Sequence, residues 1–244
     1  RSTLFPYTTL FRSRDEGDIT VDKDLTIDFN NHQINSSGYT IIVSIRKTLI
    51  LTSENRGGIA GAAVTSPVSL RSDGKAYLKG NAYAEGIAYS NAVVIFANPS
   101  QSDGYREAYF NSLSDAVAAT STYTCTLKLY DDVTDVASSI SLGNAAGVTL
   151  DLNGKKLQGQ LNSSGSIIKV PTNTKLTIID SGTGGLVWNN TDRTGNCFAL
   201  DNCGMLEIEG GTFQTRGAAN YVIKNENGAM LTVNGSSNGA FSGN

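Results

Sequence analysis

The sequence predicts an all-β chain that winds into a parallel β-helix, a solenoid of stacked coils with one short α-helix. Three observations predict this fold: short strands of alternating apolar and polar residues return at long intervals, Asn/Gly turns follow these strands, and one stretch of the chain is duplicated. The 26 Gly and frequent Asn suit turns in which a positive φ is tolerated.

The interval between equivalent strands indicates a coil of three strands. Equivalent positions fall at Thr149, Thr177, Glu207 and Thr232, with steps of 28, 30 and 25 residues. A stack of hairpins would repeat its strands every 8 to 12 residues or so. We therefore expect equivalent strands to stack in parallel, about 4.8 Å apart, with their Leu, Ile and Val side chains in inward columns.

The duplicated stretch supports the same fold. Its two copies pair residues 25–34 with 148–157, 34–38 with 161–165 after a four-residue insertion, and 49–59 with 176–186. Asn and Asp at the equivalent turns are expected to bond along the solenoid axis, which gives them a structural rather than a catalytic role. This turn set consists of Asp28, Asn30, Asp151, Asn153 and Asn234.

Residues 112–120 predict the single helix. Ser112 suits the N-cap, and Asp115 in the first turn suits both a capping box and the helix dipole. Leu113, Ala116, Val117 and Thr120 share one face. We expect this face to cover the exposed apolar edge of the first coil that follows.

The chain divides into four parts. Residues 1–13 match, codon by codon, the in-frame translation of a common sequencing adapter, so we exclude them from the fold. Residues 14–97 are expected to form a first β-helix module and 123–244 a second, both truncated at their outer ends. Residues 98–122 contain the polar joint and the capping helix.

Composition excludes several classes of function. The net charge of -3, from 19 basic and 22 acidic residues, offers no basic excess for nucleic acid. No apolar run reaches the roughly 18 residues of a membrane helix. One His and three Cys leave little for zinc or for a disulfide framework, and Cys197 and Cys203 are either buried thiols or a pair.

Several segments together resemble a known family. Residues 107–119, 126–134, 148–157 and the Gly-Gly-Thr-Phe segment 208–213 resemble the pectate-lyase-like right-handed β-helix regions of large bacterial surface proteins. The resemblance covers most of 105–244 and, more weakly, 18–97. It implies a right-handed coil, an extracellular or cell-surface location, and a polysaccharide or host glycan as partner.

The resemblance is specific for fold and not for activity, because this fold also supports lyases, hydrolases and phage tail spikes. The catalytic motifs of pectate lyases and polygalacturonases are absent, and Asp131-Asp132 stands without companion motifs. No cofactor is expected, and calcium is only weakly suggested by the acidic residues 15–18 and 22–24. We therefore expect a non-catalytic stalk or adhesin. The alternatives are a polysaccharide lyase or glycoside hydrolase fragment, and a phage tail fibre or spike.

The sequence offers one candidate ligand surface. Trp188, Asn189, Asn190 and Asp192 follow Gly184-Gly185 in a predicted loop, where an aromatic face with nearby amides would suit a pyranose ring. The alternative is a lone Trp that closes a coil. Tyr105 and Tyr109 are further candidates for stacking on a sugar.

Overall fold

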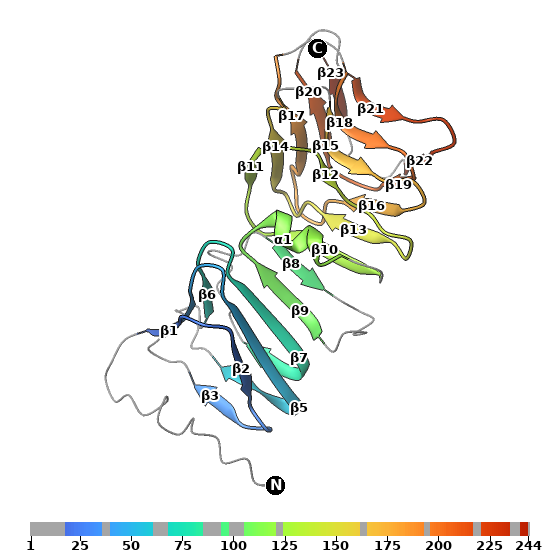
Figure 1. Cartoon of the computed structure of the whole chain (residues 1–244). Helices are drawn as coiled ribbons and strands as arrows, with labels where there is room; N and C mark the ends of the chain where they lie inside the picture. Colours follow the sequence, from blue (N-terminus) through green and yellow to red (C-terminus); the bar gives the residue numbers. More distant parts are fainter. Residues whose placement is uncertain are drawn as a thin grey trace.

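The structure is a computed structural model. It describes residues 18–35, 40–60, 68–84, 94–97, 105–120, 124–161, 165–192, 196–216, 221–234 and 240–243. The adapter-like residues 1–13 and the predicted joint 98–104 lie outside these ranges. Within them the chain forms two stacks of parallel strands and one short helix, which confirms the predicted solenoid (Figure 1).

The first stack consists of short coils in the N-terminal part of the chain. One parallel sheet contains β1 (Ile19–Val21), β4 (Ile41–Val43) and β6 (Val68–Leu70). Opposite it lie β2 (Leu25–Asp28), β5 (Thr48–Ala60) and β7 (Lys75–Ala84), with β3 (Gln33–Asn35) beside β5. These strands enclose the first core, an apolar cluster that includes Val43, Leu49 and Leu51.

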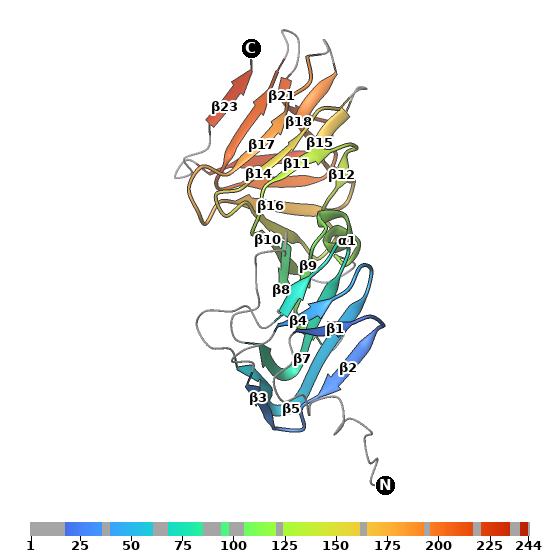
Figure 2. The ribbon, with the colours of Figure 1, turned by 90° about the vertical axis from the view of Figure 1, so that its left-hand side faces the viewer.

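The second stack has three parallel sheets around one core (Figure 2). Sheet B contains β10 (Cys125–Leu129), β13 (Val148–Asp151), β16 (Lys175–Ile179), β19 (Met205–Ile208) and β22 (Met230–Val233). Sheet C contains β11 (Val133–Val136), β14 (Lys156–Gly159), β17 (Leu186–Asn189), β20 (Thr212–Thr215) and β23 (Ala240–Gly243). Sheet D contains β12 (Ile140–Ser141), β15 (Gly165–Val170), β18 (Cys197–Asn202) and β21 (Tyr221–Asn225).

The predicted register is confirmed strand by strand. Thr149 pairs with Thr177, Thr177 with Glu207, and Glu207 with Thr232. Their apolar neighbours therefore form columns inside the second core, as in the column that runs through Leu150, Ile178 and Ile208. Each of these three side chains is completely buried.

A hairpin joins β2, β5 and β7 of the first stack to the sheet B strands of the second stack. Sheet B is therefore one continuous sheet that runs through both stacks. Strands β8 (Val94–Ala97) and β9 (Tyr105–Phe110) lie between β7 and β10, and all three of the resulting pairings are antiparallel. Strand β9 is buried on both faces: Ala108 and Phe110 point into the second core and Tyr109 points into the first. The two cores thus lie on opposite faces of sheet B.

This arrangement preserves the hand of the coil. Three antiparallel pairings in succession reverse the strand direction between β7 and β10. The core changes faces at the same point, while the coils continue in the same direction across the sheet. Reversing both the strand direction and the side on which the core lies leaves the sense of rotation unchanged, so both stacks wind with the same hand.

The predicted helix is present as α1 (Leu113–Ala118). Ser112 is its N-cap, and the Asp115 N–H donates to Ser112 Oγ over 3.4 Å. Leu113 and Ala116 are buried in the second core, with Val117 packed against it. No helix in the described ranges is long and apolar enough to cross a membrane.

The duplicated segments form the same turn. Asn30 and Asn153 both adopt a positive φ, and the N–H of each donates to the carboxylate two residues earlier, Asp28 or Asp151. The Asn153 side chain also donates to the Leu129 carbonyl of the preceding coil. Asn234 Nδ2 donates to Glu207 Oε1 over 3.1 Å.

Asp151 connects adjacent coils at this turn. It is almost fully buried and accepts hydrogen bonds from the Ser181 N–H and hydroxyl, and its Oδ2 lies 3.3 Å from Lys128 Nζ. Burial alone would raise the pKa of the carboxyl. The hydrogen bonds from Ser181 and the Asn153 N–H, together with the Lys128 charge, outweigh burial, so the pKa lies below its usual value.

We expect Asp151→Asn to lower the free energy of unfolding by about 1–3 kcal/mol at pH 7, because charge-assisted hydrogen bonds are lost. Since the folded-state pKa is below the unfolded value of about 4, the carboxylate stabilises the fold above that pH. Its contribution disappears as the pH falls through the folded-state pKa. Urea unfolding at a series of pH values should show the two proteins converging in acid, and a constant difference would contradict this.

The junction predicts separable effects from two neighbouring residues. Phe110→Ala should destabilise the second core by about 3–5 kcal/mol, since it leaves a cavity beside Tyr77, which packs edge-on against it. Tyr109→Ala should act on the first core. Amide hydrogen exchange should speed up in β10 and β13 for the first variant and in β5 for the second. Identical exchange patterns would contradict the two-faced strand.

Candidate functional site

The candidate site lies on the outer face of sheet C, around Trp188. Strand β17 alternates, with Val187 and Asn189 completely buried and Trp188 partly exposed between them. The structure therefore places Trp188 on a strand rather than in the predicted loop. A strand in the middle of a sheet holds its side chain more firmly than a loop would, because it is hydrogen-bonded on both sides.

Two glutamines flank the indole. Gln158 on β14 and Gln214 on β20 are the cross-strand partners of Trp188, one on each side. Neighbouring strands are about 4.8 Å apart, so the two amides and the indole form one row along the solenoid axis. All three side chains are partly exposed. We call Gln158, Trp188 and Gln214 the Trp188 row.

A polar group adjoins the Trp188 row. Arg216 Nε lies 2.7 Å from Asp192 Oδ1, and Arg216 Nη1 donates to Asn190 Oδ1 over 3.4 Å. Arg216 and Asp192 are both more than half exposed. Exposed ion pairs of this kind contribute at most about 1 kcal/mol to stability. Their hydrogen-bonding groups can therefore turn to a ligand at little cost to the fold.

The combination suits a ligand with alternating apolar and hydroxyl-bearing surfaces. An indole provides a broad, rigid apolar area, and the amides of Gln158 and Gln214 each offer both donors and acceptors. The Arg216–Asp192 pair adds a charged donor and a charged acceptor. Aromatic area with a few placed polar groups is typical of small-molecule sites.

Asn189 is a correction to the predicted ligand surface. Its side chain is completely buried, and Nδ2 donates to the Phe198 carbonyl over 3.0 Å and to the Gly165 carbonyl over 3.4 Å. It therefore binds sheet C to sheet D inside the coil and cannot contact a sugar. The sequence already indicated this buried position, because side chains alternate along a strand and Asn189 therefore lies on the same face as Val187.

Tyr109 is a second correction. It is 4% exposed in the first core, and its hydroxyl donates to Glu107 Oε2 over 2.7 Å. A ring in this position has no face to offer a sugar. The side chain of Tyr105 lies outside the described part of the structure. Gln158, Gln214 and Arg216, which sequence analysis missed, become visible only once the register of sheet C is known.

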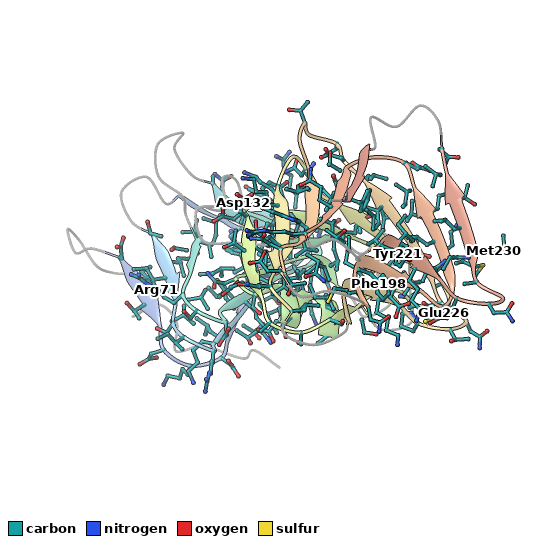
Figure 3. The ribbon with its side chains drawn as sticks, turned by 90° about the horizontal axis from the view of Figure 1, so that it is seen from above. Arg71, Asp132, Phe198, Tyr221, Glu226 and Met230 are labelled. Atoms are coloured by element: carbon teal, nitrogen blue, oxygen red, sulfur yellow. The ribbon has the colours of Figure 1, made fainter. Side chains whose placement is uncertain are left out.

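Among the described residues, one group of three side chains has the spacing of metal ligands. Asp201, Cys203 and Glu226 bring one ligand atom each within 4.8 Å of one another, at the C-terminal end of the molecule, where Glu226 is labelled (Figure 3). Both carboxylates already have cationic partners: Lys169 Nζ lies 3.9 Å from Asp201 Oδ2, and Lys224 pairs with Glu226. A metal ion would have to compete with these lysines.

The acids of the stacked turns are engaged by the backbone. Asp180 accepts from the Gly154 N–H through one oxygen, at 2.6 Å, and from the Gly185 N–H through the other, at 2.8 Å. Asp151 is held in a similar way by Ser181 and Asn153. Such carboxylates stabilise turns and have little freedom to act as a general acid or base.

Comparisons with known protein families, with curated proteins and with solved structures found no match to this chain.

The three cysteines differ in burial. All three are free thiols, so Cys197 and Cys203 do not pair in this structure. Burial raises the pKa of the Cys125 thiol to about 12, whereas Cys203 is partly exposed.

We therefore expect a maleimide reagent at pH 8 to label the partly exposed Cys203 first and to leave Cys125 unmodified until the chain unfolds, because burial shields Cys125 and its raised pKa keeps it in the unreactive thiol form. Mass spectrometry of tryptic peptides measures both rates. Cys203→Ser should remove the fast phase. Labelling of Cys125 at the rate of Cys203 would contradict the buried position.

Proposed function

We propose that this chain is a non-catalytic, extracellular β-solenoid segment of a bacterial surface protein, which acts as a stalk or adhesin and binds polysaccharide across the Trp188 row. The observation that carries the binding proposal is the position of Trp188, the only Trp in the chain, partly exposed between two in-register glutamines. The extracellular location follows from the resemblance to pectate-lyase-like regions of bacterial surface proteins.

The continuity of sheet B supports the role of stalk. Hydrogen-bonded strands run from β2 through β9 and β8 to β22, so the described strands connect the two stacks within one sheet (Figure 1). Strand β9 contributes side chains to both cores, which couples them mechanically. An extended rod of this kind can hold a binding surface away from its point of attachment.

The state of the carboxylates supports a role without catalysis. Glycoside hydrolysis requires two carboxyl groups that flank the scissile bond, one of them free to donate a proton. Asp151 and Asp180, the acids of the stacked turns, are occupied by turn hydrogen bonds. The row itself contains one indole and two amides, none of which titrates near neutral pH.

The length of the row favours a polymer over a single sugar. Gln158, Trp188 and Gln214 extend across three strands, and Asn190 and Arg216 lie two residues further along the chain, just past the ends of β17 and β20. Side chains two residues apart on one face of a strand are separated by about 6.8 Å. A chain of pyranose rings can therefore stack on the indole and reach the polar group beyond it.

We expect Trp188→Ala to weaken binding to the best ligand of a broad glycan array by at least about tenfold, because large aromatic anchors carry much of the energy of such contacts. Tyr221→Ala is the matched control, since this aromatic side chain is 70% exposed on sheet D, away from the Trp188 row. Isothermal titration with residues 14–244 measures both. Absence of any glycan ligand, or equal loss in both variants, would overturn the proposed binding surface, and depolymerisation of the glycan would favour the hydrolase or lyase alternative.

A further inference from the structure

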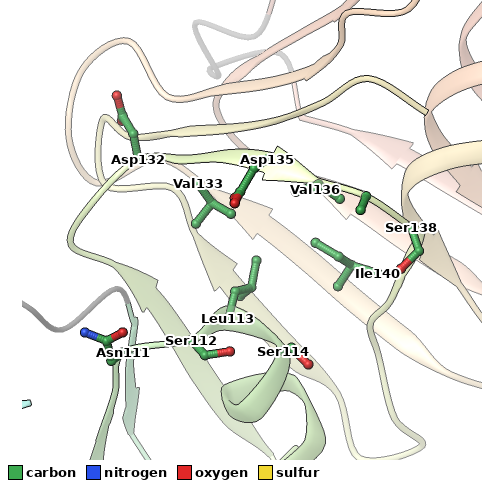
Figure 4. A pocket seen from close by; sticks show the side chains of 11 residues that line it. Asn111, Ser112, Leu113, Ser114, Asp132, Val133, Asp135, Val136, Ser138 and Ile140 are labelled. Carbon is green, nitrogen blue, oxygen red and sulfur yellow. The ribbon is translucent and has the colours of Figure 1, made fainter. Parts of the chain in front are cut away.

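A groove of about 370 Å³ lies at the base of the second stack, between α1 and the β11–β12 segment (Figure 4). It is distinct from the Trp188 row, since none of the row's side chains lines it. Its volume is at the lower end of the range of small-molecule sites, about 300–1,000 Å³. One or two sugar rings would fit a space of this size.

The groove has an apolar floor. Leu113 of α1 faces Val136 of β11 and Ile140 of β12 across it. Leu113 and Val136 are nearly buried, and Ile140 is partly exposed. Because α1 covers only part of the first coil, Ile140 and a small part of the Leu113 and Val136 side chains stay exposed in the groove.

The rim is polar and carries negative charge. Two carboxylates, Asp132 and Asp135, lie along it together with the hydroxyls of Ser114 and Ser138, and none of the described residues that line the groove is Lys, Arg or His. Asp132 accepts from the Lys156 N–H over 2.8 Å and points away from α1 in Figure 4. Asp135 is exposed and points toward Leu113, and its carboxylate has no hydrogen-bond or ion-pair partner within the described ranges.

The neighbouring acid on α1 does not add to this charge. Asp115 is paired with Lys75 of β7, whose Nζ lies 3.1 Å from its carboxylate. The unneutralised carboxylate that points into the groove is therefore that of Asp135. A cationic group would gain a charge-assisted hydrogen bond there, and an anionic group would be repelled.

We propose that this groove binds an amino sugar with a free ammonium group. The ammonium contacts Asp135, the C–H face of the ring packs on Leu113, Val136 and Ile140, and the ring hydroxyls bond to Ser114 and Ser138. An acidic sugar would bring its carboxylate against Asp135 and is excluded by the same charge. The site uses different side chains from the Trp188 row and does not depend on it.

The test is isothermal titration of residues 14–244 with a β-1,4-linked glucosamine trimer, at low salt. Asp135→Asn should weaken binding by about two- to fivefold, because it removes an exposed charge at nearly constant shape. It should leave the melting temperature unchanged, since Asp135 makes no bond in the described structure. Asp73→Asn, which alters a half-exposed acid of the first stack that pairs with Arg46, is the control and should bind like the parent.

Three comparison ligands decide the chemistry. The N-acetylated trimer has the same rings without the ammonium and should not bind at this groove, and a galacturonate trimer should not bind either. Spermidine has the charge without the ring and should bind more weakly than the glucosamine trimer. Measured in the Trp188→Ala variant, which removes the Trp188 row, equal binding of spermidine, equal binding of the acetylated trimer, or no effect of Asp135→Asn would each overturn the proposal. Trp188→Ala should leave glucosamine binding intact, so this result is separable from that for the Trp188 row.

Discussion

The structure depends on one constraint: a coil of a solenoid can bury its inward side chains only when another coil lies directly against it. The column through Leu150, Ile178 and Ile208 is completely buried, whereas Val233 on β22, the last strand of this sheet among the described residues, is 44% exposed. The difference in exposure comes from the number of neighbouring strands, because all four side chains are aliphatic. The turns obey the same constraint, because Asp151 and Asn153 direct their hydrogen bonds to adjacent coils. Strand stacking, core and turn ladder are therefore mutually dependent.

Much of the fold could be predicted because its signals are local and repeated. The register from Thr149 to Thr232 follows from strands of equal pattern, and the paired turns at Asn30 and Asn153 follow from the duplicated residues around them. The junction could not be predicted in the same way. Strand β9 alternates like any other strand, and only its position between two stacks makes both of its faces apolar environments. The residue pattern of one strand cannot show that a second core will cover its other face.

The candidate site was predictable in its centre and not in its surroundings. A single Trp among amides pointed to Trp188, but its partners Gln158 and Gln214 lie 30 and 26 residues away and meet it only through the register of sheet C. Asn189 shows the opposite case. A polar side chain is expected on the surface, but that of Asn189 is buried, where its amide donates to two backbone carbonyls. The groove beside α1 has no sequence signal, since it arises from incomplete coverage of a coil by a short helix.

The exchange of the core between the faces of sheet B has a geometric consequence. The coils of the first stack bulge from one side of the shared sheet and those of the second stack from the other, so the molecule follows a stepped, S-like path (Figures 1 and 2). The walls opposite sheet B therefore look in opposing directions. The outer wall of the first stack and that of the second can therefore contact two different partners, one on each side of the molecule.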